Sequence, residues 1–129
     1  MKKILLIEDD KFLRKVITKK LKNEKYQVIE ATDGEAGLRS AEREKPDLIL
    51  LDLVLPEMSG YEVLKLIKKK TSTSKIPVII LSNLGSQDEI EKGLKLGAVD
   101  YLIKAHLNPG EVITRMELIL NKSLKQQTK

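Results

Sequence analysis

Short runs of apolar and β-branched residues alternate five times with longer segments whose apolar residues recur at helical spacing. The runs are Ile4–Ile7, Val28–Ile29, Leu48–Leu51, Ile76–Leu81 and Val99–Ile103. The segments that follow them carry apolar residues at i, i+3 and i+4, as in a helix with one buried face. Strict strand–helix alternation is typical of a parallel sheet covered by helices on both faces. The pattern predicts an α/β, doubly wound (βα)5 fold with a five-stranded parallel sheet.

The residues within each run predict where its strand lies in the sheet. The first, third and fourth runs are continuously apolar, as expected of central strands that are buried on both faces. The second run, within Lys25–Ala31, alternates apolar and polar residues and suits an edge. In such sheets the functional groups lie beyond the carboxyl ends of the strands, near the point where the strand order reverses.

Several helix starts are marked by residues that can cap the first turn. Candidate N-caps are Asp10, Thr32, Ser59 and Ser86, the last three in a Ser/Thr-x-x-Glu pattern, and Asn108 before Pro109. Each of these side chains can accept a hydrogen bond from a backbone N–H of the first turn, which otherwise lacks a partner. For Asp10, capping competes with a role in an acidic site.

Length and composition exclude several classes of protein. The chain has 129 residues, which fits one domain over residues 1–129, with a polar tail from about residue 121. It has no cysteine, which excludes disulfides, thiolate zinc sites and a cysteine nucleophile. Its one histidine, His106, excludes a two-histidine metal site and is expected in a surface loop. Aromatic residues make up 3% of the chain, too few for a stacking platform on single-stranded nucleic acid.

Charge and hydropathy indicate a cytoplasmic protein without a membrane partner. The first apolar run has four residues and ends in three acids, whereas a secretory signal needs roughly 7–15 apolar residues. No stretch approaches the ~18 apolar residues of a membrane span. The net charge is +5, but the basic residues fall on amphipathic helices, so we interpret them as solvated helix faces and expect no direct contact with nucleic acid.

Charged and hydroxyl side chains stand where four of the expected strands end. Glu8-Asp9-Asp10 follow the first strand, Asp52 ends the third, Ser82-Asn83 the fourth and Lys104 the fifth. Three carboxylates brought together repel one another unless a cation or a proton intervenes. Carboxylates and waters are the ligands that Mg²⁺ prefers. The strand ends therefore predict a Mg²⁺ site beside a lysine and a hydroxyl group.

Four motifs in this order resemble a response-regulator receiver domain, of the single-domain kind that regulates chemotaxis. They are the acidic pair in ILLIEDD, the segment DLILLDLVLPEMSGYEVL, the hydroxyl in VIILSN and the lysine in GAVDYLIK. The resemblance extends from Lys3 to about Leu120. It implies a flavodoxin-like fold with strand order 2-1-3-4-5.

The resemblance also implies a role for each matching residue. Asp52 is the phosphoacceptor, and Lys104 and Ser82 assist the transfer of the phosphoryl group. Mg²⁺ is the cofactor, held by Asp9, by Asp52 and by the backbone carbonyl of Val54, with Glu8 bound through a water. Ser82 and Tyr101 are the switch residues. The protein is expected to catalyse only its own phosphorylation and dephosphorylation.

The implied partners are proteins. The phosphoryl donor is a sensor histidine kinase or a phosphotransfer protein, and a downstream protein target reads the face formed by the fourth helix, the fifth strand and the fifth helix. The chain is expected to be a monomer or a weak dimer that depends on phosphorylation.

Two positions depart from the family pattern. The lysine is normally followed by a proline in a cis peptide bond, but here Ala105 follows Lys104. A cis bond before a non-proline residue costs about 2.5–4 kcal/mol, so we expect Lys104–Ala105 to be trans. Asn83 stands where a small residue is usual and is expected to narrow access to Asp52.

Three other functions agree less well with the sequence than a receiver domain does. A nucleotide-binding domain needs a glycine-rich turn after the first strand, where this chain has acids that repel phosphate. A Mg²⁺-dependent phosphohydrolase with an aspartyl nucleophile would use Glu8 and Asp10, but glutamate is a poor match for that nucleophile. A receiver scaffold without activity is the third.

Overall fold

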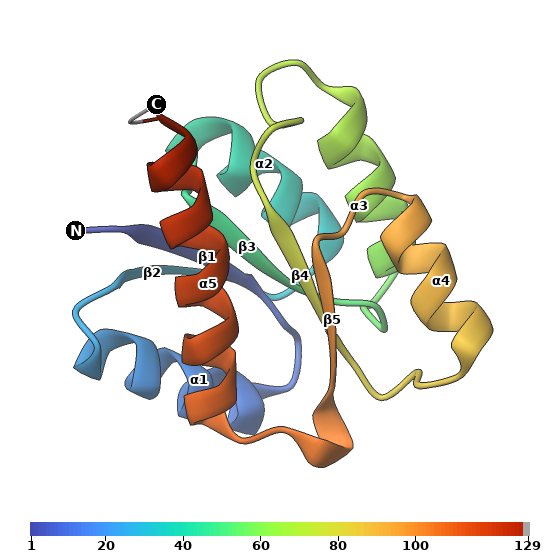
Figure 1. Cartoon of the computed structure of the whole chain (residues 1–129). Helices are drawn as coiled ribbons and strands as arrows, with labels where there is room; N and C mark the ends of the chain where they lie inside the picture. The colour runs from blue at the N-terminus through green and yellow to red at the C-terminus, as the bar shows by residue number, and fades with distance from the viewer. Residues whose placement is uncertain (128–129) are drawn as a thin grey trace.

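The computed structural model describes residues 1–127, with side chains as far as Asn121, and its five strands form one parallel sheet (Figure 1). The strands are β1 (Lys3–Ile7), β2 (Gln27–Ala31), β3 (Leu48–Asp52), β4 (Val78–Ser82) and β5 (Asp100–Ile103). Their order is β2-β1-β3-β4-β5, which confirms the predicted fold. Strand β2 lies at an edge, and the three most apolar strands are central.

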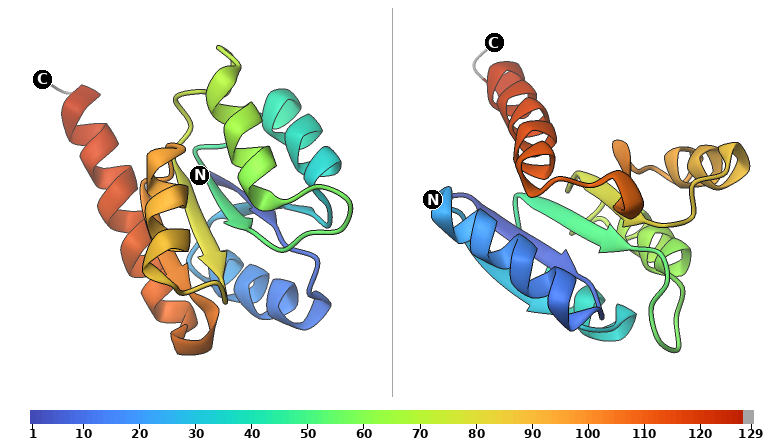
Figure 2. Two further views of the ribbon diagram at one scale, coloured as in Figure 1. Left: turned by 90° about the vertical axis from the view of Figure 1, so that its right-hand side faces the viewer. Right: turned by 90° about the horizontal axis from the view of Figure 1, so that it is seen from below.

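Five helices cover the sheet in two layers. Helices α1 (Lys11–Asn23) and α5 (Pro109–Gln127) pack on one face, and α2 (Gly34–Glu44), α3 (Gly60–Lys69) and α4 (Gln87–Lys95) pack on the other. The views in Figure 2 show α5 on the side of the sheet opposite α2 and α3. Successive residues of each strand point to alternate faces, so Leu5 and Leu6, for example, belong to two separate hydrophobic cores.

The helix caps agree with the sequence at most positions and differ at one. Asp10, Ser59 and Ser86 cap α1, α3 and α4, each accepting a hydrogen bond from the backbone N–H three residues later. The prediction for Thr32 is wrong. Helix α2 is capped by Asp33, whose Oδ1 accepts from Ala36 N at 2.8 Å, so the helix begins one residue later than the Thr32-x-x-Glu35 pattern implies.

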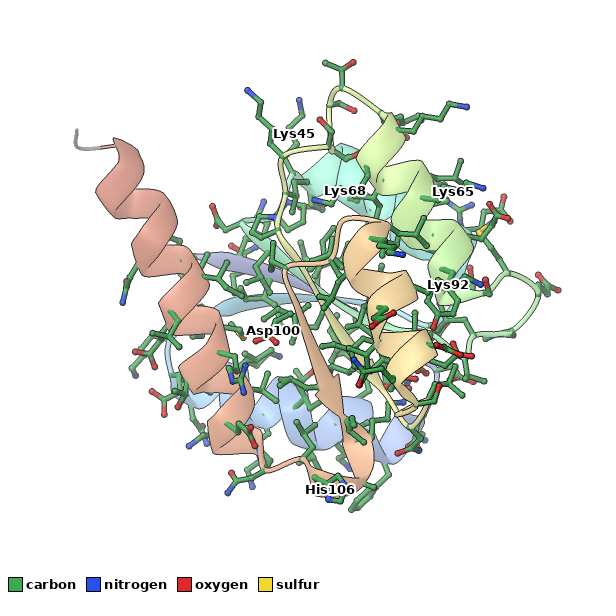
Figure 3. The ribbon with its side chains drawn as sticks, turned by 45° about the vertical axis from the view of Figure 1, so that its right-hand side comes forward. Lys45, Lys65, Lys68, Lys92, Asp100 and His106 are labelled. Carbon is green, nitrogen blue, oxygen red and sulfur yellow. The ribbon has the colours of Figure 1, made fainter. Side chains whose placement is uncertain are left out.

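The segment after β5 places Lys104 at the carboxyl edge of the sheet. Residues Lys104–His106 form a single 3-10 turn, and the Lys104–Ala105 peptide bond is trans, as expected. His106 is exposed in this turn, at the lower edge of the molecule in Figure 3. Helix α5 then continues through Gln127, into the segment expected to be a tail; residues 128–129 lie outside the described part. Among the described helices, none has both the length and the apolar character needed to cross a membrane.

Candidate functional site

The carboxyl ends of β1, β3 and β5 bring three acids and a lysine together. One carboxylate oxygen from each of Glu8, Asp9 and Asp52 lies within 4.8 Å of the others. These acids and Lys104 line a surface hollow of about 400 Å³. The rest of its lining is Asp10, Val54 and Asn83. Parallel pairing explains the convergence, because Ile7 of β1 pairs with Leu51 of β3 and Glu8 and Asp52 follow these two residues.

Glu8 is the most buried acid of the hollow. It has no exposed surface, and its Oε2 accepts a hydrogen bond from Asp10 N at 3.1 Å. Its Oε1 has an ion-pair contact with Lys104 but no well-angled hydrogen-bond donor among the described residues. Burial raises the pKa of the Glu8 carboxyl to about 7, although Lys104 and the Asp10 N–H favour the charged form. Lys104 is therefore the charged partner of the buried Glu8 carboxylate.

Lys104 places a positive charge between two of the acids. Its Nζ lies 2.7 Å from Glu8 Oε1 and 3.1 Å from Asp52 Oδ2. Burial disfavours the charged ammonium, but the two carboxylates outweigh it and hold the pKa of Lys104 above its ordinary value. Lys104 thus partly neutralises the repulsion between the carboxylates.

Asp52 is held in a fixed position at the end of β3. It is 3% exposed, and its Oδ1 accepts a hydrogen bond from Val54 N at 3.2 Å. The start of α3 packs against the backbone here, since Gly60 N donates to Leu53 O at 2.8 Å. A Cβ at Gly60 would lie 2.2 Å from Asp52 O, too close for a side chain. Glycine at this position allows the helix to support the strand end that carries Asp52.

Ser82 and Tyr101 lie outside the lining of the hollow but are joined through one residue. Leu84 N donates to Ser82 Oγ at 3.1 Å, and the Tyr101 hydroxyl donates to Leu84 O. Ser82 is fully buried. Tyr101 is half-buried, and burial raises the pKa of its hydroxyl. The backbone of Leu84 therefore connects the end of β4 with the ring on β5.

Sequence reasoning missed Arg14, which fixes the acidic strand end from α1. Its Nη1 donates to Glu8 O at 3.0 Å and to Asp9 O at 3.2 Å, while its Nε pairs with Glu30 Oε1 at 3.0 Å. The guanidinium fork makes such simultaneous contacts possible. The one sequence feature that could have indicated this role is the presence of an arginine in the first turn of the helix that follows the acids.

A second polar group ties α3 to α4 on the opposite face of the sheet. The Tyr61 hydroxyl donates to Glu89 O at 3.0 Å and also contacts the Glu89 carboxylate. The Lys92 ammonium lies 4.2 Å from the centre of the Tyr61 ring, within the range of a cation–π contact. Burial raises the pKa of the Tyr61 hydroxyl, and Glu89 raises it further.

An ion pair also joins α5 to β5, where Arg115 pairs with Asp100 at 2.7 Å.

The donor set of the hollow fits a hard divalent cation. Its oxygens come from the carboxylates of the exposed Asp9 and of the buried Glu8 and Asp52. Mg²⁺ takes one or two carboxylates and keeps several waters, and the hollow has room for them. The acidic cluster therefore matches the chemistry of a magnesium site.

Comparison with known proteins gives one consistent family. The model of the response regulator receiver domain matches residues 4–117. The alkaline phosphatase synthesis transcriptional regulatory protein PhoP of Bacillus subtilis is 40% identical over 122 residues, which cover 95% of this chain and 50% of that protein. The phosphate regulon regulatory protein PhoB of Klebsiella pneumoniae is 33% identical over 94% of this chain and 52% of its own length. The chain thus spans about half the length of these curated relatives.

Solved structures agree with that family. The receiver domain of a LuxO-type repressor protein from Vibrio parahaemolyticus superposes with a TM-score of 0.89 at 32% identity, covering 99% of this chain and 97% of that one. The receiver domain of a sensor histidine kinase from Pseudomonas aeruginosa has a TM-score of 0.85 at 32% identity, covering 93% and 98%. That structure has a magnesium ion coordinated in its active site cleft.

Proposed function

Because this chain belongs to the family of response regulator receiver domains, we propose that its Asp52 accepts a phosphoryl group from a phosphohistidine of a sensor histidine kinase or a phosphotransfer protein. Proteins of this kind carry signals and are not classical enzymes. The observation that supports the acceptor role is the contact of Lys104 with Asp52 at 3.1 Å inside an open, acid-lined hollow.

The transfer needs a nucleophile and neutralisation of charge. A carboxylate oxygen of Asp52 forms a bond to phosphorus while the phosphorus–nitrogen bond of the phosphohistidine breaks, and the imidazole nitrogen keeps the electron pair. Catalysis of this step rests on positioning and electrostatics. The Val54 N–H and the support from Gly60 orient Asp52, and Lys104 is placed to pair with the incoming phosphoryl oxygens.

We assign the Mg²⁺ site to Asp9, Asp52 and the Val54 carbonyl, with Glu8 acting through a water. A bound Mg²⁺ supplies additional neutralisation of the phosphoryl charge. Lys104 lies on the Glu8 side of Asp52 and provides the second positive charge.

The switch in this proposal acts through Leu84. Once Asp52 is phosphorylated, Ser82 Oγ turns to donate to a phosphoryl oxygen, and Leu84 N loses its acceptor. The loop that carries Leu84 O then shifts and releases the Tyr101 hydroxyl. A downstream protein target reads the resulting change at α4, β5 and α5.

Phosphorylation with a small phosphodonor and Mg²⁺, followed by intact-mass spectrometry, tests the acceptor role. The wild type should gain one phosphoryl group, and Asp52→Asn should gain none. Asp88→Asn removes an exposed carboxylate on α4 and serves as the matched control that stays labelled. Labelling of Asp52→Asn at the wild-type rate would refute the assignment, and rapid turnover of donor without a stable adduct would indicate a phosphohydrolase.

Isothermal titration with Mg²⁺ tests the metal site separately. Asp9→Ala and Asp52→Ala should each abolish the binding heat. Asp10→Asn removes a neighbouring charge but retains a good N-cap residue for α1, so it should bind nearly as well as the wild type. Binding that is unchanged in both alanine variants would contradict the assignment.

A further inference from the structure

A basic groove runs along the side of α1 that faces β2. It has a volume of about 570 Å³, and five cations line it: Lys11, Arg14, Lys15, Lys19 and Lys22. The lysines at positions 11, 15, 19 and 22 recur every three or four residues, so they form one row along the helix, with Arg14 next to Lys15 in the sequence. The row is about 16 Å long, given a rise of about 1.5 Å per residue.

The positive charge of the basic groove is largely uncompensated. Glu30 is the one acid in the lining, and Arg14 already pairs with it at 3.0 Å. Among the described residues, no carboxylate lies within 4.0 Å of the Lys11, Lys15, Lys19 or Lys22 ammonium groups, although Lys20 and Arg14 on the same helix do form ion pairs. Like charges four residues apart on a helix destabilise it. A bound anion would relieve this repulsion.

The lining also indicates the class of ligand. Its residues are all polar or charged and contribute apolar surface only through their aliphatic parts, whereas the centre of a protein interface carries apolar and often aromatic residues. It contains no aromatic residue on which a base of single-stranded nucleic acid can stack. A flat bilayer surface does not fill a concave groove. A compact, linear and highly charged anion, which binds through oxygen acceptors, fits this lining better than these three classes.

We propose that the basic groove binds a linear polyphosphate, with the lysine row pairing along its phosphates. Arg14 links the groove to the candidate active site, because the same guanidinium holds Glu8 O and Asp9 O. The proposal does not depend on the phosphorylation of Asp52.

Calorimetric titration with sodium tripolyphosphate at low salt, without Mg²⁺, tests this proposal. The wild type and Asp52→Asn should bind alike, and affinity should fall as salt is added. Lys15→Gln/Lys19→Gln/Lys22→Gln should lose affinity on the order of tenfold, from three lost ion contacts. The matched triple variant is Lys65→Gln/Lys69→Gln/Lys95→Gln, which removes the same charge from exposed positions on α3 and α4 and should retain the affinity. Lys65 lies on α3, away from α1 (Figure 3).

Two further measurements make the result specific. In the wild type, amide chemical shifts should change in α1 and near Glu30 and remain constant on α3 and α4. Thr18→Val keeps the shape of the side chain but not the hydroxyl, and it should bind like the wild type, because Thr18 Oγ1 has almost no accessible surface. An equal loss of affinity in both triple variants would overturn the proposal. So would the absence of binding, or tight binding of a single-stranded oligonucleotide without binding of tripolyphosphate.

Discussion

Lys104 Nζ lies 2.7 Å from Glu8 Oε1, so the lysine that we propose to pair with the phosphoryl group also compensates a buried carboxylate. In Lys104→Met the Glu8 and Asp52 carboxylates would face each other without a cation. We expect the free energy of unfolding to fall by about 2 kcal/mol or more at pH 8, because breaking a buried ion pair leaves a charge uncompensated.

Urea denaturation without Mg²⁺ measures this loss. It should be smaller at pH 5, where Glu8 holds a proton. Lys69→Met removes an exposed lysine of α3 and should change stability little. An unfolding free energy of Lys104→Met at pH 8 equal to that of the wild type would show that the ion pair contributes nothing.

The raised pKa of Glu8 predicts a pH dependence of stability that runs against the usual one for an acid. The ordinary value is 4.5, and the folded state raises it to about 7. Between these values the folded chain binds more protons than the unfolded chain, so stability falls as the pH rises and levels off above about 7. At 1.36 kcal/mol for each pKa unit, the loss is about 3 kcal/mol.

Glu8→Gln cannot titrate and is the reference for this effect. Unfolding free energies of the wild type and of Glu8→Gln should be compared at pH 5 and pH 8 in Mg²⁺-free buffer. The wild type should lose stability relative to the variant at the higher pH. A constant difference between the two proteins would mean that Glu8 is ionised throughout this range.

If Asp52 is the acceptor, its phosphorylated form should decay slowly. Hydrolysis needs a water in line with phosphorus, and the residues two positions after Asp52 and Ser82 are the apolar Val54 and Leu84. Val54 lines the hollow, whereas Leu84 lies outside its lining. Neither side chain can orient a water. We expect Val54→Asn/Leu84→Glu to speed the decay, by about tenfold for each 1.4 kcal/mol removed from the barrier.

The decay is followed by intact mass after removal of the phosphodonor. The two single variants separate the positions, and Val54→Asn should have the larger effect because Val54 faces the hollow. If the double variant decays no faster than the wild type, crowding by these side chains does not control the lifetime.

The hydroxyl of Tyr61 should stabilise the attachment of α4. Tyr61→Phe keeps the ring beneath Lys92 but removes the hydrogen bond to Glu89 O. We expect a loss of about 1 kcal/mol and faster amide hydrogen exchange in α4. Tyr26→Phe is the control, since the Tyr26 hydroxyl makes no hydrogen bond among the described residues. Equal exchange rates in α4 of both variants would remove this role from Tyr61.

The sheet and its acids were predictable from the sequence because local pattern determines both. Continuous apolar runs mark buried parallel strands, and a charged residue directly after such a run must lie at the edge of the sheet. The start of α2 was not predictable from the capping pattern, since Thr32 and Asp33 are both good N-cap residues. In the structure Asp33 is the residue whose side chain accepts the capping hydrogen bond. Lys45 ends α2 in the left-handed conformation, with φ of 46°, at a position where glycine would be expected.

The contacts that connect the site were beyond sequence reasoning. Arg14 reaches two backbone carbonyls, and Leu84 joins Ser82 to Tyr101 through its own main chain. Backbone acceptors and donors are present at every residue, so nothing in the residue types marks these particular ones. They follow from the geometry of the loops after β1 and β4.

The site forms only when the central strands pair in the correct register. Asp52 of β3 lies opposite Leu81 of β4, and Ser82 of β4 lies opposite Ile103 of β5. A shift of one residue in either pair would turn the side chains to the other face of the sheet and separate Asp52 from Lys104 or Ser82. A chain that has not closed all of its strand pairs still contains Asp52, but without the neighbouring charges. Only correctly folded copies therefore carry the assembled group of Asp52, Ser82 and Lys104.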